Sequence, residues 1–203
     1  MWYSFCRLMS QVAFAVCFRL RAIDRGRVPR TGGVLLVANH QSYLDPVIVA
    51  VGLPRAVSFM ARRSLFKVAP FRWLIESLGA FPIDRGRPDI KALKEGIRRL
   101  RAGRIVVVYP EGTRTRDGSV GEFHSGFLMM AERAGVPVTP VAIVGADRAW
   151  HRSRALPRPA PIRVRYGEPL TPEEVKKKGR DLAAETIRQR IVAMVGREGG
   201  VRR

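Results

Sequence analysis

Short apolar runs alternate with longer amphipathic stretches along most of this chain. Residues 34–38 and 105–109 are apolar at almost every position and too short for helices, which is typical of strands buried on both faces. Further strand candidates are residues 57–61, 79–83, 136–144 and 162–166. Each candidate is bounded by glycine, proline or polar residues that favour turns.

Helical periodicity is clearest in residues 88–102. Its apolar stripe consists of Ile90, Leu93, Ile97 and Leu100, and Gly103 follows as a stop signal. Residues 127–134 predict a short helix. The last helix is expected to begin at a capping box of Thr171 and Glu174, to divide at Gly179, and to turn Leu182, Ile187, Ile191 and Met194 inward.

This alternation of strands and helices predicts an α/β fold with a mostly parallel central sheet flanked by helices. The length of 203 residues fits one such domain, expected over residues 25–203, with residues 1–24 as an N-terminal helix. In parallel sheets, sites gather outside the carboxyl ends of the strands. The polar residues that directly follow the strands are therefore the candidates for function.

The first segment has apolar residues at helical spacing: Trp2, Phe5, Met9, Val12, Val16 and Ile23. Its uncharged part, residues 8–18, would span about 16 Å as a helix, roughly half the hydrocarbon thickness of a bilayer. An amphipathic helix lying on a membrane surface is therefore expected, rather than one that crosses it. The alternative is a first helix that packs into the core.

Charge narrows the possible partners. The chain has 37 Lys and Arg against 17 Asp and Glu, a net charge of +20, which favours an anionic surface or a polyanion. Membrane lipid and nucleic acid are both candidates, and part of the arginine content has a second explanation in the codon usage of a GC-rich genome. The two cysteines, Cys6 and Cys17, are too far apart along a helix for a disulfide, so free thiols and a reducing compartment are expected.

Residues 39–45 allow two interpretations. Ser42 has the spacing of an N-cap with Asp45 three residues later, which would make Asp45 a capping residue. Alternatively, the turn before the helix brings His40 and Asp45 together, and the carboxylate orients the imidazole as a general base. Both interpretations remain open on this segment alone.

Two other polar segments should reach the same sheet edge. Their anion binders would be Arg85, Arg87, Arg114 and Arg116, and their hydroxyl binders Glu111, Thr113 and Thr115. The spacing of His and Cys matches no metal site, and a Gly-x-Ser-x-Gly elbow is missing from the sequence. A base without a protein nucleophile suggests activation of a substrate hydroxyl, and the arginines suggest a phosphate on that substrate.

Four segments resemble, in order, the motifs of the glycerol-phosphate acyltransferases, particularly the 1-acylglycerol-3-phosphate acyltransferases. They are the His-x4-Asp segment 39–45, Gly-Ala-Phe-Pro-Ile-Asp-Arg at 79–85, Tyr-Pro-Glu-Gly-Thr-Arg at 109–114, and Val-Pro-Val-Thr-Pro-Val at 136–141. Together they cover residues 34–145. A lone His-x4-Asp would be weak, whereas four motifs in register are specific.

The resemblance implies that His40 takes the proton from an sn-2 hydroxyl as this attacks an acyl thioester, without an acyl-enzyme, while Asp45 holds the imidazole. The residues implied to bind glycerol phosphate are Arg85, Glu111, Gly112, Thr113 and Arg114. His124 stands where the family often has lysine and is a further candidate for the phosphate. Neither a metal nor a cofactor is implied.

The implied partners are a lysophospholipid, an acyl-CoA or acyl carrier protein, and anionic lipids at the cytoplasmic face of the cell membrane. Nucleic acid is not expected as a partner. One alternative keeps the chemistry and changes the acceptor, for example to glycerol 3-phosphate or another lysophospholipid. The other is a non-catalytic basic module, whose salt-dependent binding to a membrane or nucleic acid would be indifferent to His40.

Overall fold

The computed structural model describes residues 2–84 and 89–199. The strands are β1 (Arg21–Ile23), β2 (Val34–Ala38), β3 (Val57–Arg62), β4 (Ala80–Ile83), β5 (Ile105–Val108), β6 (Val138–Val144) and β7 (Arg163–Tyr166). The α-helices are α1 (Trp2–Phe18), α2 (Asp45–Val51), α3 (Ala69–Ser77), α4 (Ile90–Arg101), α5 (Leu128–Ala134), α6 (Ala146–Ala149), α7 (Pro172–Lys178) and α8 (Arg180–Gly199).

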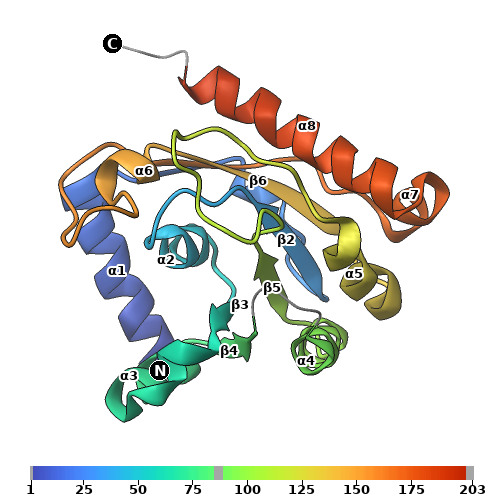
Figure 1. The fold of residues 1–203 in the computed structure, drawn as a ribbon, viewed down its shortest axis with the longest axis horizontal. Coiled ribbons are helices and arrows are strands. Elements are labelled where there is room, and N and C mark those ends of the chain that lie inside the picture. The colour runs from blue at the N-terminus through green and yellow to red at the C-terminus, as the bar shows by residue number, and fades with distance from the viewer. Residues whose placement is uncertain (1, 85–88, 200–203) are drawn as a thin grey trace.

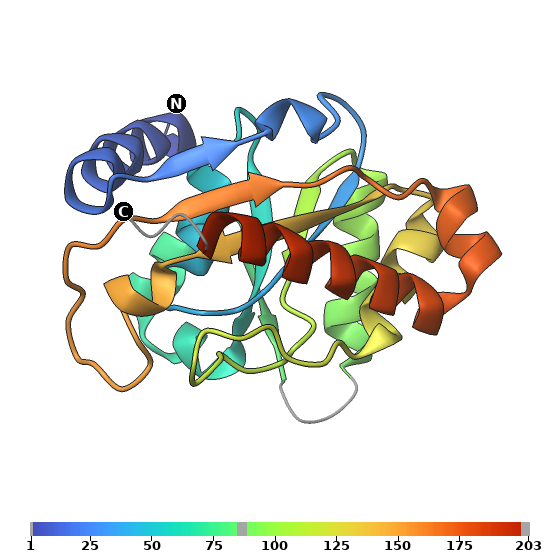
Figure 2. The same cartoon turned by 90° about the horizontal axis from the view of Figure 1, so that it is seen from above.

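The strands of the described residues form one seven-stranded sheet in the order β1-β7-β6-β2-β5-β3-β4. All neighbouring strands are parallel except β6 and β7. Helices α4, α5, α7 and α8 cover one face of the sheet, and α1, α2 and α6 lie on the other (Figures 1 and 2). The predicted α/β fold with a mostly parallel sheet is therefore confirmed.

Burial explains why the central strands are apolar at every position. The five residues of β2 and the four residues of β5 are all buried, because each strand has a hydrophobic cluster on both faces of the sheet. The capping box of Thr171 and Glu174 and the division at Gly179 are also confirmed. Leu182, in contrast, is 58% exposed, so its predicted inward position is wrong.

The end of the first helix and the start of the second differ from the sequence predictions. The first helix ends at Phe18, and after two further residues the chain forms β1, which pairs with β7 at one edge of the sheet. Helix α2 begins at Asp45 after Leu44, so Ser42 is not its N-cap. The Ser42 hydroxyl instead donates to the carbonyl of Trp150 and accepts from the N–H of Leu44.

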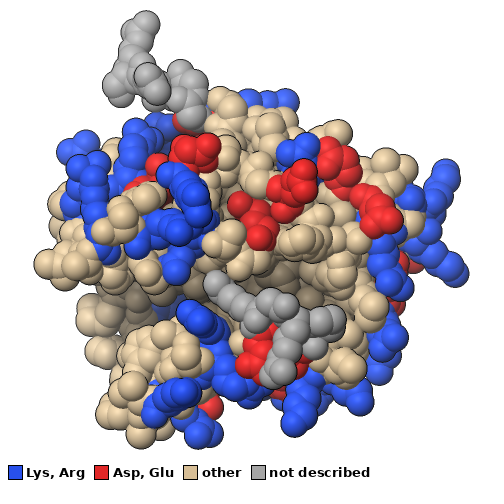
Figure 3. Space-filling view, viewed as in Figure 1, with Lys and Arg blue, Asp and Glu red and all other residues tan. Residues whose placement is uncertain are grey.

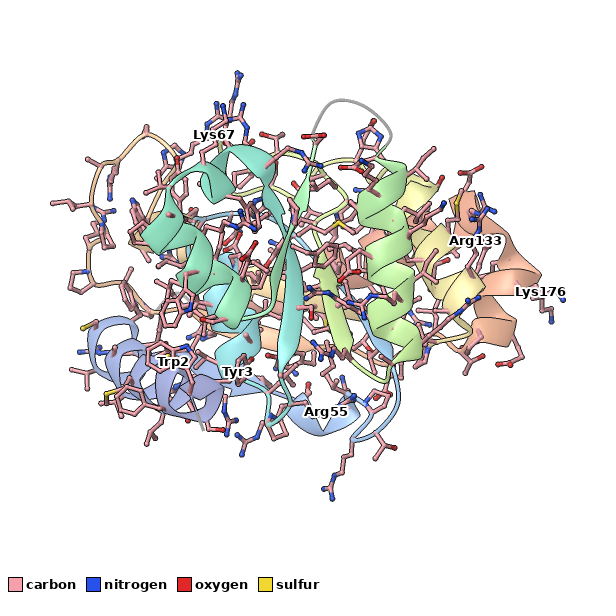
Figure 4. All side chains as sticks on the ribbon, turned by 90° about the horizontal axis from the view of Figure 1, so that it is seen from below. Trp2, Tyr3, Arg55, Lys67, Arg133 and Lys176 are labelled. Carbon is pink, nitrogen blue, oxygen red and sulfur yellow. The ribbon has the colours of Figure 1, made fainter. Side chains whose placement is uncertain are left out.

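Helix α1 lies on the surface, close to α2 and α3. Its Arg7 side chain donates to the carbonyl of Leu53, and the Trp2 ring packs on Trp73 with 5.7 Å between centroids. Figure 4 shows Trp2 where α1 approaches α3. Several apolar side chains of α1 are exposed: Trp2, Phe5, Leu8, Met9, Val12 and Val16. Over residues 2–84 and 89–199, no helix has both the length and the hydropathy needed to span a bilayer.

Asn39 marks the point where the chain leaves the sheet. Its side-chain amide donates to the carbonyl of Ile143 at 3.0 Å, and its amide oxygen accepts from the N–H of the same residue at 2.8 Å. The side chain of Asn39 thus extends the hydrogen bonding between β2 and β6 by one residue beyond Ala38. The segment that begins at His40 can then turn away at the carboxyl edge of the sheet.

Candidate active site

His40 and Asp45 lie together at the carboxyl end of β2. The Nδ1 atom of His40 is 2.7 Å from Oδ2 of Asp45, and both side chains are buried. The same carboxylate oxygen also accepts from the backbone N–H groups of Gln41 at 2.6 Å and Ser42 at 2.8 Å. A carboxylate at Nδ1 fixes the imidazole tautomer and leaves Nε2 as the nitrogen that can accept a proton.

The ring of Tyr109 stacks on the ring of His40. Their centroids are 4.3 Å apart, and the planes are inclined by 24°. Burial raises the pKa of the Tyr109 phenol well above its ordinary value, and the negative charge of Asp45 raises it further. The phenol is therefore uncharged at neutral pH, and its ring supports the flat face of the imidazole.

The loop after β5 wraps around the segment that carries His40. The N–H of Thr115 donates to the His40 carbonyl at 2.9 Å, and the Gln41 side chain donates to the carbonyl of Gly118 at 3.2 Å. The loop begins with a tight turn in which the N–H of Gly112 donates to the Tyr109 carbonyl. Gly112 has φ 68°, a left-handed conformation that favours glycine.

Glu111 points back from this turn toward His40. Its Oε1 accepts from the backbone N–H of His40 at 2.9 Å, and its Oε2 accepts from that of Gly121 at 3.2 Å. Burial raises the pKa of the Glu111 carboxyl, and the charge of Asp45 adds to this effect against the lowering by the two N–H donors. Each oxygen of the Glu111 carboxyl thus accepts a hydrogen bond from a backbone N–H group.

A cavity of about 840 Å³ opens beside His40. Its walls come from β3, β4, α4, β5, α5 and the residues just before α5, and they are mainly apolar: Met60, Ile83, Ile90, Leu93, Val108, Phe127, Met129 and Met130. Polar residues lie in the wall as well, including Asp84, Asp89 and His124. An apolar cavity beside a histidine suits a ligand with a hydrocarbon chain and a reactive polar end.

The other candidate residues are distributed as follows. Gly112 and His124 line the cavity beside His40, whereas Thr113 is exposed on the loop. The guanidinium of Arg114 lies over the ring of Tyr43, 3.5 Å from its centroid. Arg85 and Arg87 lie outside the described residues, so their expected role in anion binding stays a prediction.

Several site residues were not recognised from the sequence. Tyr109 is part of the segment Tyr-Pro-Glu-Gly-Thr-Arg, but the sequence does not indicate that its ring supports His40. One feature of the sequence pointed indirectly to the methionines of the cavity. Gly96 lies inside the amphipathic helix α4, where a glycine often allows another side chain to pack closely against the helix. A β-carbon at Gly96 would lie 2.6 Å from Sδ of Met130.

Within residues 2–84 and 89–199, no group of three or more His, Cys, Asp or Glu residues could hold a metal ion. The chemistry of the described site is that of an imidazole, a carboxylate and backbone amides. The imidazole of His40 can remove a proton from a hydroxyl that is brought to its Nε2 atom. The wall next to it can hold an apolar chain at the same time.

The chain is similar to known proteins over most of its length. A family model described as Acyltransferase matches residues 19–144. The 1-acyl-sn-glycerol-3-phosphate acyltransferase of Bacillus subtilis is 26% identical over 169 residues, which cover 83% of this chain and 82% of the relative. The crystal structure of the LPA acyltransferase PlsC from Thermotoga maritima superposes with a TM-score of 0.86 at 26% identity, over 99% of this chain and 80% of that one.

A chloroplastic relative from Brassica napus, also named a 1-acyl-sn-glycerol-3-phosphate acyltransferase, is 32% identical over 114 residues, or 55% of this chain. The match spans 33% of that relative, about a third of its length. The resemblance carried by the four sequence motifs is confirmed. Because the family model covers more than half of the chain, the protein belongs to the acyltransferase family, with 1-acyl-sn-glycerol-3-phosphate acyltransferases among its relatives.

Proposed function

We propose that the protein transfers a fatty acyl chain from an acyl thioester to the sn-2 hydroxyl of 1-acylglycerol 3-phosphate, giving phosphatidic acid. The observation that carries this proposal is the buried His40–Asp45 pair at the wall of an apolar cavity. The names of the relatives in Bacillus subtilis and Brassica napus support 1-acylglycerol 3-phosphate as the acceptor. The donor is acyl-CoA or acyl carrier protein.

The reaction proceeds in one displacement without an acyl-enzyme. The hydroxyl oxygen forms a bond to the thioester carbonyl carbon while its proton passes to Nε2 of His40. The carbon–sulfur bond then breaks, and the leaving thiolate takes that proton. Asp45 stabilises the imidazolium in between, since its carboxylate is 2.7 Å from Nδ1. General-base catalysis of this kind contributes a factor of about 10²–10⁴.

The acyl chain occupies the apolar cavity, and cations around the site bind the phosphate of the acceptor. Arg85 and Arg114 are the proposed phosphate ligands, and Gly112, Thr113 and His124 are the other proposed contacts of the acceptor. This assignment requires the guanidinium of Arg114 to leave the ring of Tyr43 or to bind phosphate from its edge. Neither a metal nor a cofactor takes part in the proposed reaction.

The protein is proposed to act as a peripheral protein at the cytoplasmic face of the cell membrane. Support comes from the exposed apolar side chains of α1 and from cations elsewhere on the surface. Figure 3 shows Lys and Arg gathered over α6 and the segment that follows it, which includes exposed Arg148, Arg152, Arg154 and Arg158. Basic residues near an anionic membrane surface contribute about 1 kcal/mol each.

Thiol release from acyl-CoA and from acylated carrier protein tests the reaction, with lysophosphatidic acid, glycerol 3-phosphate and other lysophospholipids as acceptors. Lysophosphatidic acid should give the highest kcat/KM, and His40→Ala should lower kcat by about 10²-fold or more. His151→Ala is the matched control, because that histidine lies outside the cavity wall. Undiminished turnover in His40→Ala would refute the assigned base, and a better substrate among the other acceptors would change the assigned acceptor.

A further inference from the structure

The backbone of His40 is held at both of its polar groups by one loop. Its N–H donates to Oε1 of Glu111 at 2.9 Å, and its carbonyl accepts from the N–H of Thr115 at 2.9 Å. The side chain is held separately, by Asp45 at Nδ1 and by Tyr109 on the ring face. The position of Nε2 therefore depends on the loop after β5 as well as on the partner carboxylate.

Glu111 is the acidic residue that contacts the His40 backbone in this arrangement. Hydrogen bonds to an ionised acceptor are roughly twice as strong as those between neutral groups. The second oxygen of Glu111 accepts from the N–H of Gly121, at the far side of the same loop. One carboxylate thus joins the start of the loop, its far side and the backbone of His40.

The surroundings of Glu111 fit this role better than contact with a substrate. Gly121 allows the close approach, since a β-carbon there would lie 3.2 Å from Oε2 and 3.6 Å from Cγ of Glu111. Among the described residues, those that line the cavity include His40, Gly112 and His124 but not Glu111. Glu111 precedes Gly112, which has φ 68°, and its side chain reaches the His40 backbone.

We propose that Glu111 is a positioning residue, which sets the place of Nε2 of His40 through the His40 backbone, and that it does not bind the glycerol phosphate. This inference rests on the proposed acyl transfer and departs from the substrate contact implied by the family motif. A displacement of about 1 Å in a reacting group can cost about 10²-fold in rate. Loss of the Glu111 contact should therefore act on the chemical step.

Kinetics of Glu111→Ala and Glu111→Gln separate the two roles. Positioning predicts that kcat falls by about 10²-fold in the alanine variant while KM for lysophosphatidic acid changes by less than about 3-fold. The glutamine variant should recover part of kcat, because its amide oxygen can still accept from the His40 N–H. A substrate ligand would instead show a raised KM with kcat little changed, and that result would overturn the proposal.

Two further variants complete the design. Glu122→Gln removes a carboxylate from the same loop at an exposed position and should leave kcat and KM unchanged. Gly121→Ala would put a β-carbon 3.2 Å from Oε2 of Glu111, so the carboxylate must shift by a few tenths of an ångström. This variant should lower kcat with KM unchanged, even if Glu111→Ala fails to fold. Wild-type kcat in Gly121→Ala, with the contact between Glu111 and the His40 N–H broken, would count against the proposal.

Hydrogen exchange at the His40 amide gives a readout that does not need turnover. This N–H should exchange slowly in the wild type and in Glu122→Gln, and at least about 10-fold faster in Glu111→Ala or, if that variant does not fold, in Gly121→Ala. Equal exchange in all variants would overturn the proposal. A wild type that releases no thiol with any acceptor would refute the proposed function, and the exchange rates would still decide whether Glu111 holds His40.

Discussion

The imidazole of His40 lies on the phenol ring of Tyr109, and the hydroxyl of that phenol is buried without a hydrogen-bond partner in the part of the chain that the structure describes. The ring and the hydroxyl therefore make separable contributions. The ring limits the tilt of the imidazole, whereas a buried hydroxyl that lacks a partner costs about 1–3 kcal/mol.

Tyr109→Phe should keep activity within about 3-fold of wild type and raise the free energy of unfolding by about 1 kcal/mol, because it keeps the ring and removes the unpaired hydroxyl. Tyr109→Ala should lower kcat, because the support of the imidazole is lost. Turnover and urea denaturation of both variants measure these effects. A large loss of kcat in the phenylalanine variant would show that the hydroxyl takes part in the reaction.

Gly96→Ala should shift selectivity toward shorter acyl chains. The new β-carbon would lie 2.6 Å from Sδ of Met130, and this flexible thioether lines the cavity into which it can move. Exclusion of one methylene from an apolar pocket changes discrimination by about 10-fold or more. A donor panel of increasing chain length measures the shift.

The matched control for that experiment is Gly196→Ala on α8, where a β-carbon meets nothing within 4 Å. Its chain-length profile should equal that of the wild type. If Gly96→Ala also keeps the wild-type profile, the proposed place of the acyl chain is wrong.

Acid stability should depend in part on Glu95 of α4. Hydrogen bonds from Arg98, and then from Arg99, lower the pKa of Glu95 from 4.5 to about 2 against the opposing effect of burial. A lowered pKa in the folded state stabilises the protein above the unfolded value, and this contribution is lost as pH falls from about 5 to about 2. Partial exposure limits the contribution to about 0.5–1 kcal/mol.

The Glu95→Gln variant should therefore be less stable than the wild type at pH 7. Its free energy of unfolding should also fall by less on acidification. Chemical denaturation at neutral and acidic pH measures both differences. Glu76→Gln, which removes an exposed ion pair with Arg72, should change stability at pH 7 by less. Equal acid sensitivity in Glu95→Gln and wild type would show that Glu95 does not contribute to the pH dependence.

Exposed apolar residues of α1 should contribute to membrane binding. Phe5→Ser and Val12→Ser should each weaken sedimentation with vesicles of anionic lipid by about 10-fold, because insertion of a large apolar side chain contributes about 1.5–3 kcal/mol. Both residues are more than half exposed, so the melting temperature should change little. Leu182→Ser on α8 is the control, and an equal effect there would contradict a specific role of α1.

The fold was predictable because its strongest elements follow simple patterns. Strands β2 and β5 have continuous apolar runs, and α4 has a clear stripe, so local sequence and tertiary burial agree. The first helix was predicted too long, since apolar spacing alone does not show that Arg21–Ile23 finds a strand partner in β7, far away in sequence. Ser42 matched the capping pattern, yet tertiary contacts placed its hydroxyl on Trp150.

At the site, the closeness of His40 and Asp45 was one of two interpretations of the local sequence, and the structure shows that the turn before α2 brings them together. The contacts of Glu111 could not be predicted in the same way. Its carboxylate reaches a residue 71 positions earlier, and the motif gives no indication of whether the side chain faces a ligand or the protein. The cavity combines side chains from several strands and helices, so its shape depends on packing rather than on any single segment.

The side chain of Asn39 has a consequence for tolerance to substitution. Ile143 presents one donor and one acceptor to it, and a planar carboxamide supplies the complement of both, as a peptide unit would. Aspartate has the same shape but no donor, and it would set a negative charge against the carbonyl of Ile143. The carboxamide of Asn39 therefore takes the place of a peptide group beside β6, and its donor and acceptor, rather than its size, determine which residue is tolerated at position 39. The backbone N–H and carbonyl of His40 remain available to the loop after β5, which binds both.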